Sequence, residues 1–479
     1  MKRGKKLILL TAVLLLLIGG TFLARSRTTK VVELEEAEES TVLYQLNTDE
    51  LSAISWTDGD ETISLLKNGD TWSLEGDADF PLSTAKADTL AANFRELRAE
   101  KTIDNPDALS TYGLEDPSCS ITITAETEMR FELGSEKSMD GYLYLSVGDG
   151  KIYLVDSALL DSFSCGLYDL VRKESLPDMS DMISLTVHSE VQDYEIDHIK
   201  NSGIAYTDQY EWFLKDGDNW LTLDTSLTEE FADQVRILAW QECVNYRADA
   251  EALSAYGLDV PAVTAELRYR KTSQIETDLL ADDGKPIYDT VEEEKQFTLE
   301  IGDYTDSGCY ARIAESPMVY IISSSVCDEL LYMSYDDLRP NNVIMLDMNE
   351  LTKVDASVDG ETSTFMKTEQ TVTDEEGNSS TETVYLLDDR ETPFSEVLYS
   401  LGALLSDNYA GDEAPKRSRE LTFVFYRDND RHPETELIFY SYDSSNCLVT
   451  LDGESTVFID RYSVDSLKEK ITNLMTVPQ

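Results

Sequence analysis

The chain contains two near-copies of one long segment, followed by a weaker third copy. The stretch DALSTYGLEDP (107–117) returns as EALSAYGLDVP (251–261), and LLKNGDTW (65–72) returns as FLKDGDNW (213–220). The third copy, which closes with ESTVFIDRYSVDSLKEKI (454–471), lacks both phrases. Because each copy of such a segment tends to fold as one unit that packs on its neighbours, we expect tandem repeats of one small fold.

The spacing of the copies predicts where the repeats begin and end. Prolines at Leu176-Pro177 and Arg339-Pro340 suit connections that lead into a new strand. Repeat two carries an additional polar hairpin near 271–296, with Asp283-Gly284 at its expected tip. The predicted segments are a signal anchor at 1–30, an acidic linker at 31–48, repeat one at 49–177, repeat two at 178–340 and divergent repeat three at 341–479.

Each repeat combines short strand-like stretches with an amphipathic helix. In repeat one, Leu90, Phe94 and Leu97 form an apolar stripe at helical spacing, and SITIT (120–124) and KIYLV (151–155) have strand character. Strands joined by close turns favour antiparallel pairing. We therefore predict an α+β fold in which an N-terminal transmembrane helix precedes three tandem repeats, each a mostly antiparallel sheet with a helix across one face.

The repeated phrase follows the rules of a short capped helix. Asn105 in the first copy and Asp249 in the second stand where an N-cap side chain accepts a hydrogen bond. Gly113 and Gly257 follow, and glycine is the usual residue at a helix end that needs positive φ. The other shared positions are the leucines that touch across such an end and the prolines that stop the helix: Leu109, Leu114, Pro117, Leu253, Leu258 and Pro261.

Four aromatic residues are left as candidate contacts with a ligand or a partner. Tyr112 and Tyr256 are the shared residues that the helix rules do not explain, and Trp72 and Trp220 follow Gly-Asp turns. The simpler interpretation is that all four pack on the core of their unit. The alternative is an exposed ring that stacks on a ligand such as a sugar.

The N-terminus has the pattern of a membrane segment. The first 30 residues contain seven basic residues and no acidic ones, and residues 7–24 carry no charge. Phe22 and Leu23 are too large for a signal-peptidase site, so an uncleaved anchor is favoured over a cleaved signal peptide. The denser basic cluster before the span predicts a single-pass cell-membrane protein with a cytoplasmic N-terminus and an extracytoplasmic body.

The composition excludes several classes of function. The net charge of −55 would repel nucleic acid, and catalytic motifs such as GxSxG, HExxH and a Walker loop are absent from the sequence. The six cysteines form no CxxC pair, and Cys327 aligns with Leu160 of repeat one, which predicts a small buried apolar residue. We therefore expect no catalytic residues, no metal site and no cofactor.

The motifs in this order resemble the family catalogued as domain of unknown function 4340. Its pattern is a strand, a tryptophan turn, a helix, YGLEDP or YGLDVP, then ELG or EIG and a closing strand, over about residues 50–335 and loosely in repeat three. The resemblance implies a bacterial envelope protein with one N-terminal membrane segment. Some members are linked to ABC-type transport or to gliding motility. The resemblance brings no catalytic residues.

The combined features predict a non-enzymatic, membrane-anchored extracytoplasmic repeat protein. It would contact the membrane through residues 7–24 and act as a scaffold or accessory component with an envelope or transporter protein as its partner. One alternative is an extracellular module that binds glycan or peptide. The other is an envelope hydrolase that uses carboxylates, which are numerous in this acidic body.

Overall fold

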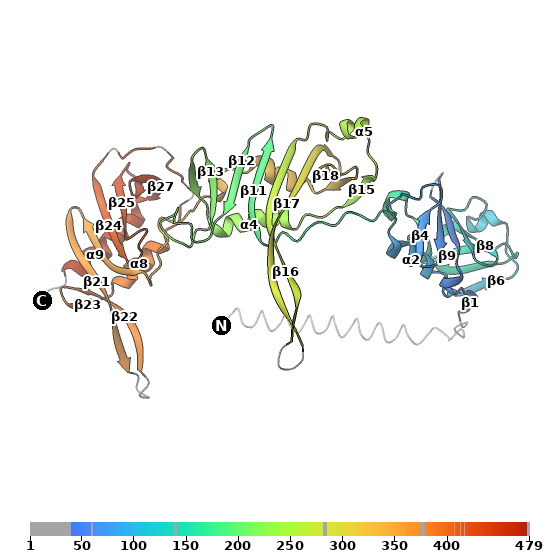
Figure 1. Ribbon diagram of the computed structural model, residues 1–479, viewed down its shortest axis with the longest axis horizontal. Coiled ribbons are helices and arrows are strands. Elements are labelled where there is room, and N and C mark those ends of the chain that lie inside the picture. Colours follow the sequence, from blue (N-terminus) through green and yellow to red (C-terminus); the bar gives the residue numbers. More distant parts are fainter. Residues whose placement is uncertain are drawn as a thin grey trace, which may run out of the picture. The chain divides into compact units, whose positions relative to one another are not determined.

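The computed structural model describes residues 40–476, apart from 59–60, 138–140, 281–284, 374–378, 407, 412 and 416. The chain divides into two compact units, Met1–Lys173 and Glu174–Gln479, and each is described by itself. The described strands form one small and three large sheets, in which all neighbouring strands pair antiparallel (Figure 1).

The first unit contains an eight-stranded sheet in the order β4-β3-β2-β7-β8-β9-β10-β6, and a small sheet in which β1 pairs with β5. Its strands are β1 (Thr41–Tyr44), β2 (Ala53–Asp58), β3 (Glu61–Asn68), β4 (Thr71–Leu74), β5 (Leu97–Ala99), β6 (Lys101–Ile103), β7 (Cys119–Thr124), β8 (Glu128–Lys137), β9 (Tyr142–Ser146) and β10 (Ile152–Asp156). Its helices are η1 (Thr48–Glu50), α2 (Thr84–Ala92), η2 (Leu109–Tyr112), α3 (Ala158–Phe163) and η3 (Leu167–Leu170).

The second unit begins with a nine-stranded sheet, the second large sheet, in the order β14-β13-β12-β11-β16-β17-β18-β19-β15. Its strands are β11 (Met182–Ser189), β12 (Tyr194–His198), β13 (Trp212–Asp216), β14 (Asn219–Thr222), β15 (Glu242–Asn245), β16 (Val263–Leu280), β17 (Pro286–Thr305), β18 (Gly308–Ile313) and β19 (Val319–Ile322). Its helices are α4 (Thr225–Arg236), α5 (Ala250–Ala255), α6 (Ser324–Tyr332) and α7 (Tyr335–Leu338).

The third large sheet has eight strands in the order β23-β22-β21-β20-β24-β25-β26-β27. The strands are β20 (Leu351–Val358), β21 (Glu361–Thr373), β22 (Ser379–Leu387), β23 (Arg390–Thr392), β24 (Arg419–Arg427), β25 (Glu434–Ser441), β26 (Asn446–Leu451) and β27 (Glu454–Asp460). Two helices accompany them, α8 (Phe394–Gly402) and α9 (Arg461–Thr476).

The prediction of an α+β fold is wrong, because β-structure dominates. The structure is 46% strand and 20% helix. Long hairpins that extend well beyond their sheets contain much of the strand structure. β16 and β17 have 18 and 20 residues, and β21 has 13 (Figure 1). Most described helices are much shorter, and α5 and α7 have six and four residues.

The prediction of a single-pass membrane protein also needs correction. Among the helices that the structure describes, none is both long and apolar enough to cross a membrane. The span expected over residues 7–24 lies outside the described residues. The predicted anchor, cell-membrane localisation and orientation are therefore not supported.

Alternating side chains build the cores of the sheets. In β7, Cys119, Ile121 and Ile123 are buried and their neighbours are half-buried, as expected for a strand with one face on a core. In the third sheet, α9 buries Val464 and Leu467, which share one face of the helix and pack with the strands below.

Candidate partner-binding groove

The two tyrosines of the repeated phrase pack on strands of their own sheets. The ring of Tyr112 lies 5.0 Å from that of Tyr144 on β9, and Tyr256 lies 4.6 Å from Tyr310 on β18. The Tyr112 hydroxyl also accepts a hydrogen bond from the Asp107 N–H, at 3.2 Å. Since Tyr112 is only 8% exposed, its ring offers little surface to a ligand.

The second copy of the phrase forms an α-helix, whereas the first forms a single 3-10 turn. Asp249 is the N-cap of α5, and its side chain accepts from the Ala252 N–H at 2.9 Å. The prediction that Asn105 caps the first copy is wrong, because η2 begins at Leu109 with Ala108 at its N-cap. The first copy has Asp107 and Thr111 where α5 has Glu251 and Ala255, and aspartate and threonine are weaker helix formers than glutamate and alanine.

Both copies end in the same way. Gly113 and Gly257 have φ of 65° and 67°, and the N–H groups of Leu114 and Leu258 reach back to carbonyls five residues earlier. These bonds measure 3.0 Å to Leu109 and 2.8 Å to Leu253.

The leucine contact predicted across this helix end is incomplete in the first copy. Leu114 and Leu258 are buried, and Leu253 packs beside the second, but the Leu109 side chain is 47% exposed. Pro117 and Pro261 each stand two residues before the next strand, β7 or β16.

The tryptophans of the Gly-Asp turns are parts of the packed sheets. Trp72 on β4 is buried, and its indole N–H donates to Asp88 of α2 at 2.8 Å. Trp220 on β14 is half-buried beside Tyr210 and Phe213. Neither ring forms the open platform on which a sugar would stack.

Trp212 in the second large sheet corresponds to Trp72 in the first. Each tryptophan donates its indole N–H to a carboxylate on a neighbouring helix. The Trp212 indole N–H donates to Glu229 of α4 at 2.8 Å, and His198 stacks on its ring with centroids 4.5 Å apart. The sequence interpretation missed Trp212, because the Gly-Asp turn pointed to Trp220 as the equivalent residue.

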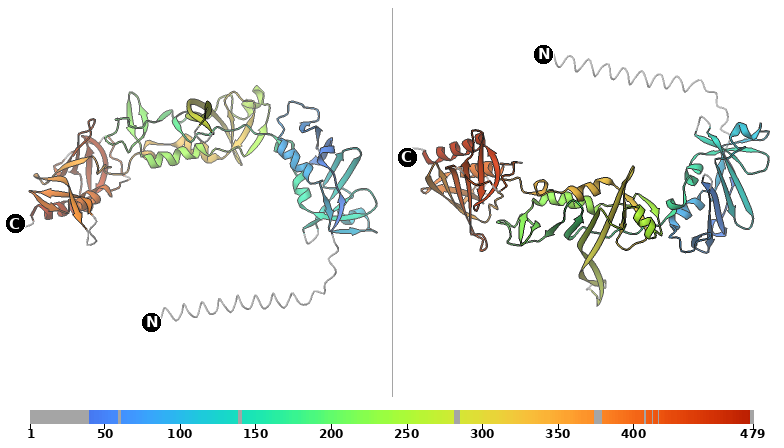
Figure 2. Two further views of the ribbon diagram at one scale, coloured as in Figure 1. Left: turned by 60° about the horizontal axis from the view of Figure 1, so that its bottom comes forward. Right: turned by 90° about the horizontal axis from the view of Figure 1, so that it is seen from above.

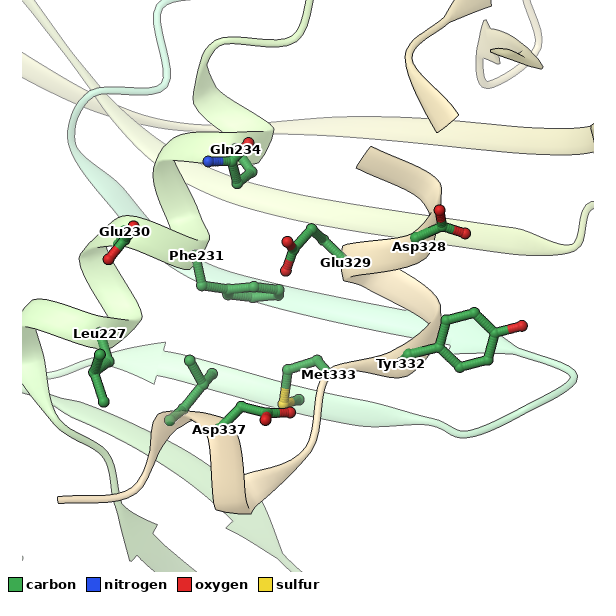
Figure 3. A pocket seen from close by; sticks show the side chains of 10 residues that line it. Leu227, Glu230, Phe231, Gln234, Asp328, Glu329, Tyr332, Met333 and Asp337 are labelled. Carbon is green, nitrogen blue, oxygen red and sulfur yellow. The ribbon is translucent and has the colours of Figure 1, made fainter. Parts of the chain in front are cut away.

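The strongest candidate site is a groove of about 430 Å³ between α4 and α6, closed at one end by α7 (Figure 3). The helices α4 and α6 lie side by side on one face of the second large sheet (Figure 2). The amphipathic pattern of α4 turns Thr228, Ala232 and Val235 into the core. The next residues around the helix, Glu230 and Gln234, line the groove instead.

The floor of the groove is apolar and its rim is acidic. Phe231 from α4 and Met333, which follows α6, lie at the floor and are each 6% exposed, with Leu227 and Leu338 beside them. Four exposed carboxylates complete the lining: Glu230, Asp328, Glu329 and Asp337. Figure 3 shows Glu329 directed from α6 towards Phe231, whereas the Tyr332 ring points outward.

Among the described residues that line the groove, none is basic. The nearest arginines in sequence are already paired: Arg236 with Glu229 and Asp233, and Arg339 with Asp336 at 2.6 Å. Nowhere in the described parts of the chain do three His, Cys, Asp or Glu side chains form a group that could hold a metal ion. The carboxylates of the rim are therefore available to pair with a cationic side chain of a partner protein.

A larger hollow of about 760 Å³ beside α8 is a weaker candidate. Its lining includes Lys367 and Lys470, which would attract an anion. Both ammonium groups already donate to oxygens of the protein, Lys367 to the Met348 carbonyl at 2.6 Å and Lys470 to the Ser400 hydroxyl at 2.6 Å. Because of these hydrogen bonds, the two ammonium groups have fewer N–H donors available for an anionic ligand.

Comparison with protein families gives two matches to one model. Residues 72–261 and 241–421 each match the domain of unknown function DUF4340. The two segments overlap at 241–261, and the second extends into the third large sheet. No curated protein and no solved structure matches the chain.

Proposed function

We propose that this chain, which belongs to the DUF4340 family of domains of unknown function, is a non-enzymatic protein that binds a basic amphipathic helix of a partner protein. The site is the groove between α4 and α6. The observation that carries the proposal is the combination of an apolar floor with a carboxylate rim and no basic residue in the described lining.

Charge selects the class of partner. Four exposed carboxylates surround one small apolar floor, and the chain as a whole carries a net charge of −55. A second copy of the chain, or a nucleic acid, would bring further negative charge to this rim. A partner segment with Lys or Arg beside apolar residues complements both features, and its charge would also speed the encounter.

The geometry suits a helix that lies along the groove. Carboxylates stand on both sides, Glu230 on α4 and Asp328 and Glu329 on α6, while Phe231 and Met333 lie between them (Figure 3). In helix-in-groove recognition, apolar side chains spaced three and four residues apart enter such a floor. Basic residues on the flanks of the bound helix would then reach the carboxylates.

The exposure of the carboxylates supports binding more than catalysis. An acid–base pair in a hydrolase needs two carboxyl groups in different, partly enclosed environments. All four groove carboxylates are exposed. The expected class of partner, a transporter or other envelope protein, remains a prediction of the sequence.

Two model peptides test the proposal directly. The first is a short amphipathic helix of leucine and lysine, and the second replaces every lysine with glutamate. Fluorescence anisotropy should show binding of the basic peptide alone. Binding should weaken about tenfold in the double variant Glu230→Gln and Glu329→Gln, through loss of two charge pairs worth about 0.5–1 kcal/mol each.

A matched control is Glu251→Gln, which removes an exposed glutamate on α5, away from the groove. This variant should bind the basic peptide as the unmodified chain does. Equal binding of both peptides, or unchanged binding in the groove double variant, would overturn the proposal.

A further inference from the structure

Cys309 and Cys327 meet under α6 in the second large sheet. Cys309 pairs with Ile322 across β18 and β19, and the chain then turns at Ser323 into α6. α6 then packs against β18, which carries Cys309, and this contact places the Cys327 side chain beside Cys309. Both side chains are fully buried, and their thiols are hydrogen-bonded to each other.

We propose that Cys309 and Cys327 are a disulfide-forming pair, which an organic disulfide oxidises to an intramolecular cross-link between α6 and β18. Both residues are free thiols in the structure. The proposal concerns a covalent site beneath α6 and does not depend on what the groove binds.

The surroundings favour Cys327 as the attacking sulfur. The hydrogen bond from the Cys309 thiol lowers the pKa of Cys327, and burial opposes this effect. The hydrogen bond to Cys327 and burial together raise the pKa of Cys309. Since the thiolate is the nucleophile in disulfide exchange, Cys327 is expected to react first.

The reaction balances in two exchange steps. The Cys327 thiolate attacks one sulfur of R–S–S–R, the S–S bond breaks, and the departing RS⁻ takes up the proton that Cys327 lost. Cys309 then loses its proton and attacks the Cys327 sulfur of the mixed disulfide, which releases a second RSH. The protein loses two protons and two electrons, and these reduce the organic disulfide to two thiols.

Burial determines when the reaction can occur. Neither sulfur is open to solvent, so an oxidant reaches the pair only when α6 lifts from the sheet or before the sheet has folded. Tyr304 is half exposed beside the pair, and its hydroxyl donates to Asp328 of α6 at 2.7 Å. Exchange should therefore be slow in the native protein and faster in low concentrations of urea.

Mass spectrometry of the full chain provides the test. The reduced protein is unfolded in urea, refolded with oxidised glutathione, alkylated and digested. The expected result is a peptide that links Cys309 to Cys327, with a loss of two hydrogens per chain. The linked protein should also melt about 4 °C or more higher than the reduced protein, because the cross-link restricts the unfolded chain.

Two variants serve as controls. Cys327→Ala should leave Cys309 as a mixed disulfide or a free thiol. Cys447→Ala, which changes a buried cysteine on β26 of the third sheet, should leave the link intact. If the unmodified chain keeps Cys309 and Cys327 separately alkylated, or links either of them to another cysteine, the proposal is wrong.

Discussion

The carbonyl oxygen of Tyr256 lies so close to Gly302 that a methyl group on this glycine would stand 2.1 Å from it. The same relationship occurs in the first unit, where a methyl group on Gly134 would stand 2.2 Å from the Tyr112 carbonyl oxygen. Next to this approach, the Asp303 N–H donates to the Tyr256 carbonyl at 3.0 Å. The YGL phrase and the ELG or EIG phrase are therefore two sides of one backbone contact.

This contact predicts that Gly302→Ala destabilises the second unit. The added methyl group forces the β17 backbone away from the phrase, and overpacking of this kind costs about 1–3 kcal/mol. Urea unfolding monitored by circular dichroism measures the change. Gly402→Ala is the matched control, because a methyl group there meets no atom within 4 Å, and it should be neutral or slightly stabilising. Equal stability of the two variants would contradict this explanation.

The Trp72 hydrogen bond predicts a specific role for Asp88. Asp88→Ala leaves a buried indole N–H without its acceptor, which costs about 1–3 kcal/mol of unfolding free energy. Asp88→Asn keeps an oxygen acceptor and should retain most of the stability. Thermal unfolding of both variants checks the difference. If the two variants have the same melting temperature, the hydrogen bond does not account for the position of Trp72.

Local features of the fold could be predicted from the sequence, and long-range contacts could not. Gly257 ends α5 because positive φ is a property of that residue and its neighbours. Asn105 failed as a cap because weak helix formers follow it, and Trp212 was missed because its partner Glu229 lies on a helix beyond the next strand. The groove and the cysteine pair depend on how α6 folds back over the sheet, which no local pattern records.

Salt should weaken the binding proposed for the groove. The four rim carboxylates are exposed, so ions screen their attraction to a basic helix. The affinity for the leucine–lysine peptide should fall about 3- to 10-fold between about 0.05 M and about 0.5 M NaCl. Fluorescence anisotropy at several salt concentrations measures the slope. Binding that strengthens with salt would indicate an apolar contact elsewhere on the chain.

The ion pair between Glu420 and Arg461 predicts that the third sheet loses stability in acid. Burial raises the pKa of Glu420, but hydrogen bonds from Arg461 and Ser441 outweigh it and hold the pKa below its ordinary value. A lowered pKa in the folded state gives stability that is present above the unfolded pKa, about 4.3, and is lost as the pH falls through the folded value. Glu420→Gln should therefore cost about 1–3 kcal/mol at neutral pH and progressively less below about pH 4. Urea unfolding across this range tests the trend, and a pH-independent difference would exclude the ion pair as its cause.

Arg427 is expected to couple the second and third large sheets. It is buried at the end of β24, where it donates to the Tyr206 carbonyl oxygen and to the Thr435 hydroxyl. The Tyr206 hydroxyl in turn accepts from the Met345 N–H at 2.8 Å. Arg427→Ala removes charged donors from buried oxygens, which costs about 1.5–3 kcal/mol.

Because these bonds hold the segment around Tyr206 against the third sheet, Arg427→Ala should also separate the unfolding of the second and third sheets into two calorimetric transitions. Arg419→Ala is the control, since Arg419 pairs with Glu436 at an exposed position and should contribute less than about 1 kcal/mol. If Arg427→Ala and Arg419→Ala give the same calorimetric profile, the contact at Tyr206 does not couple the two sheets.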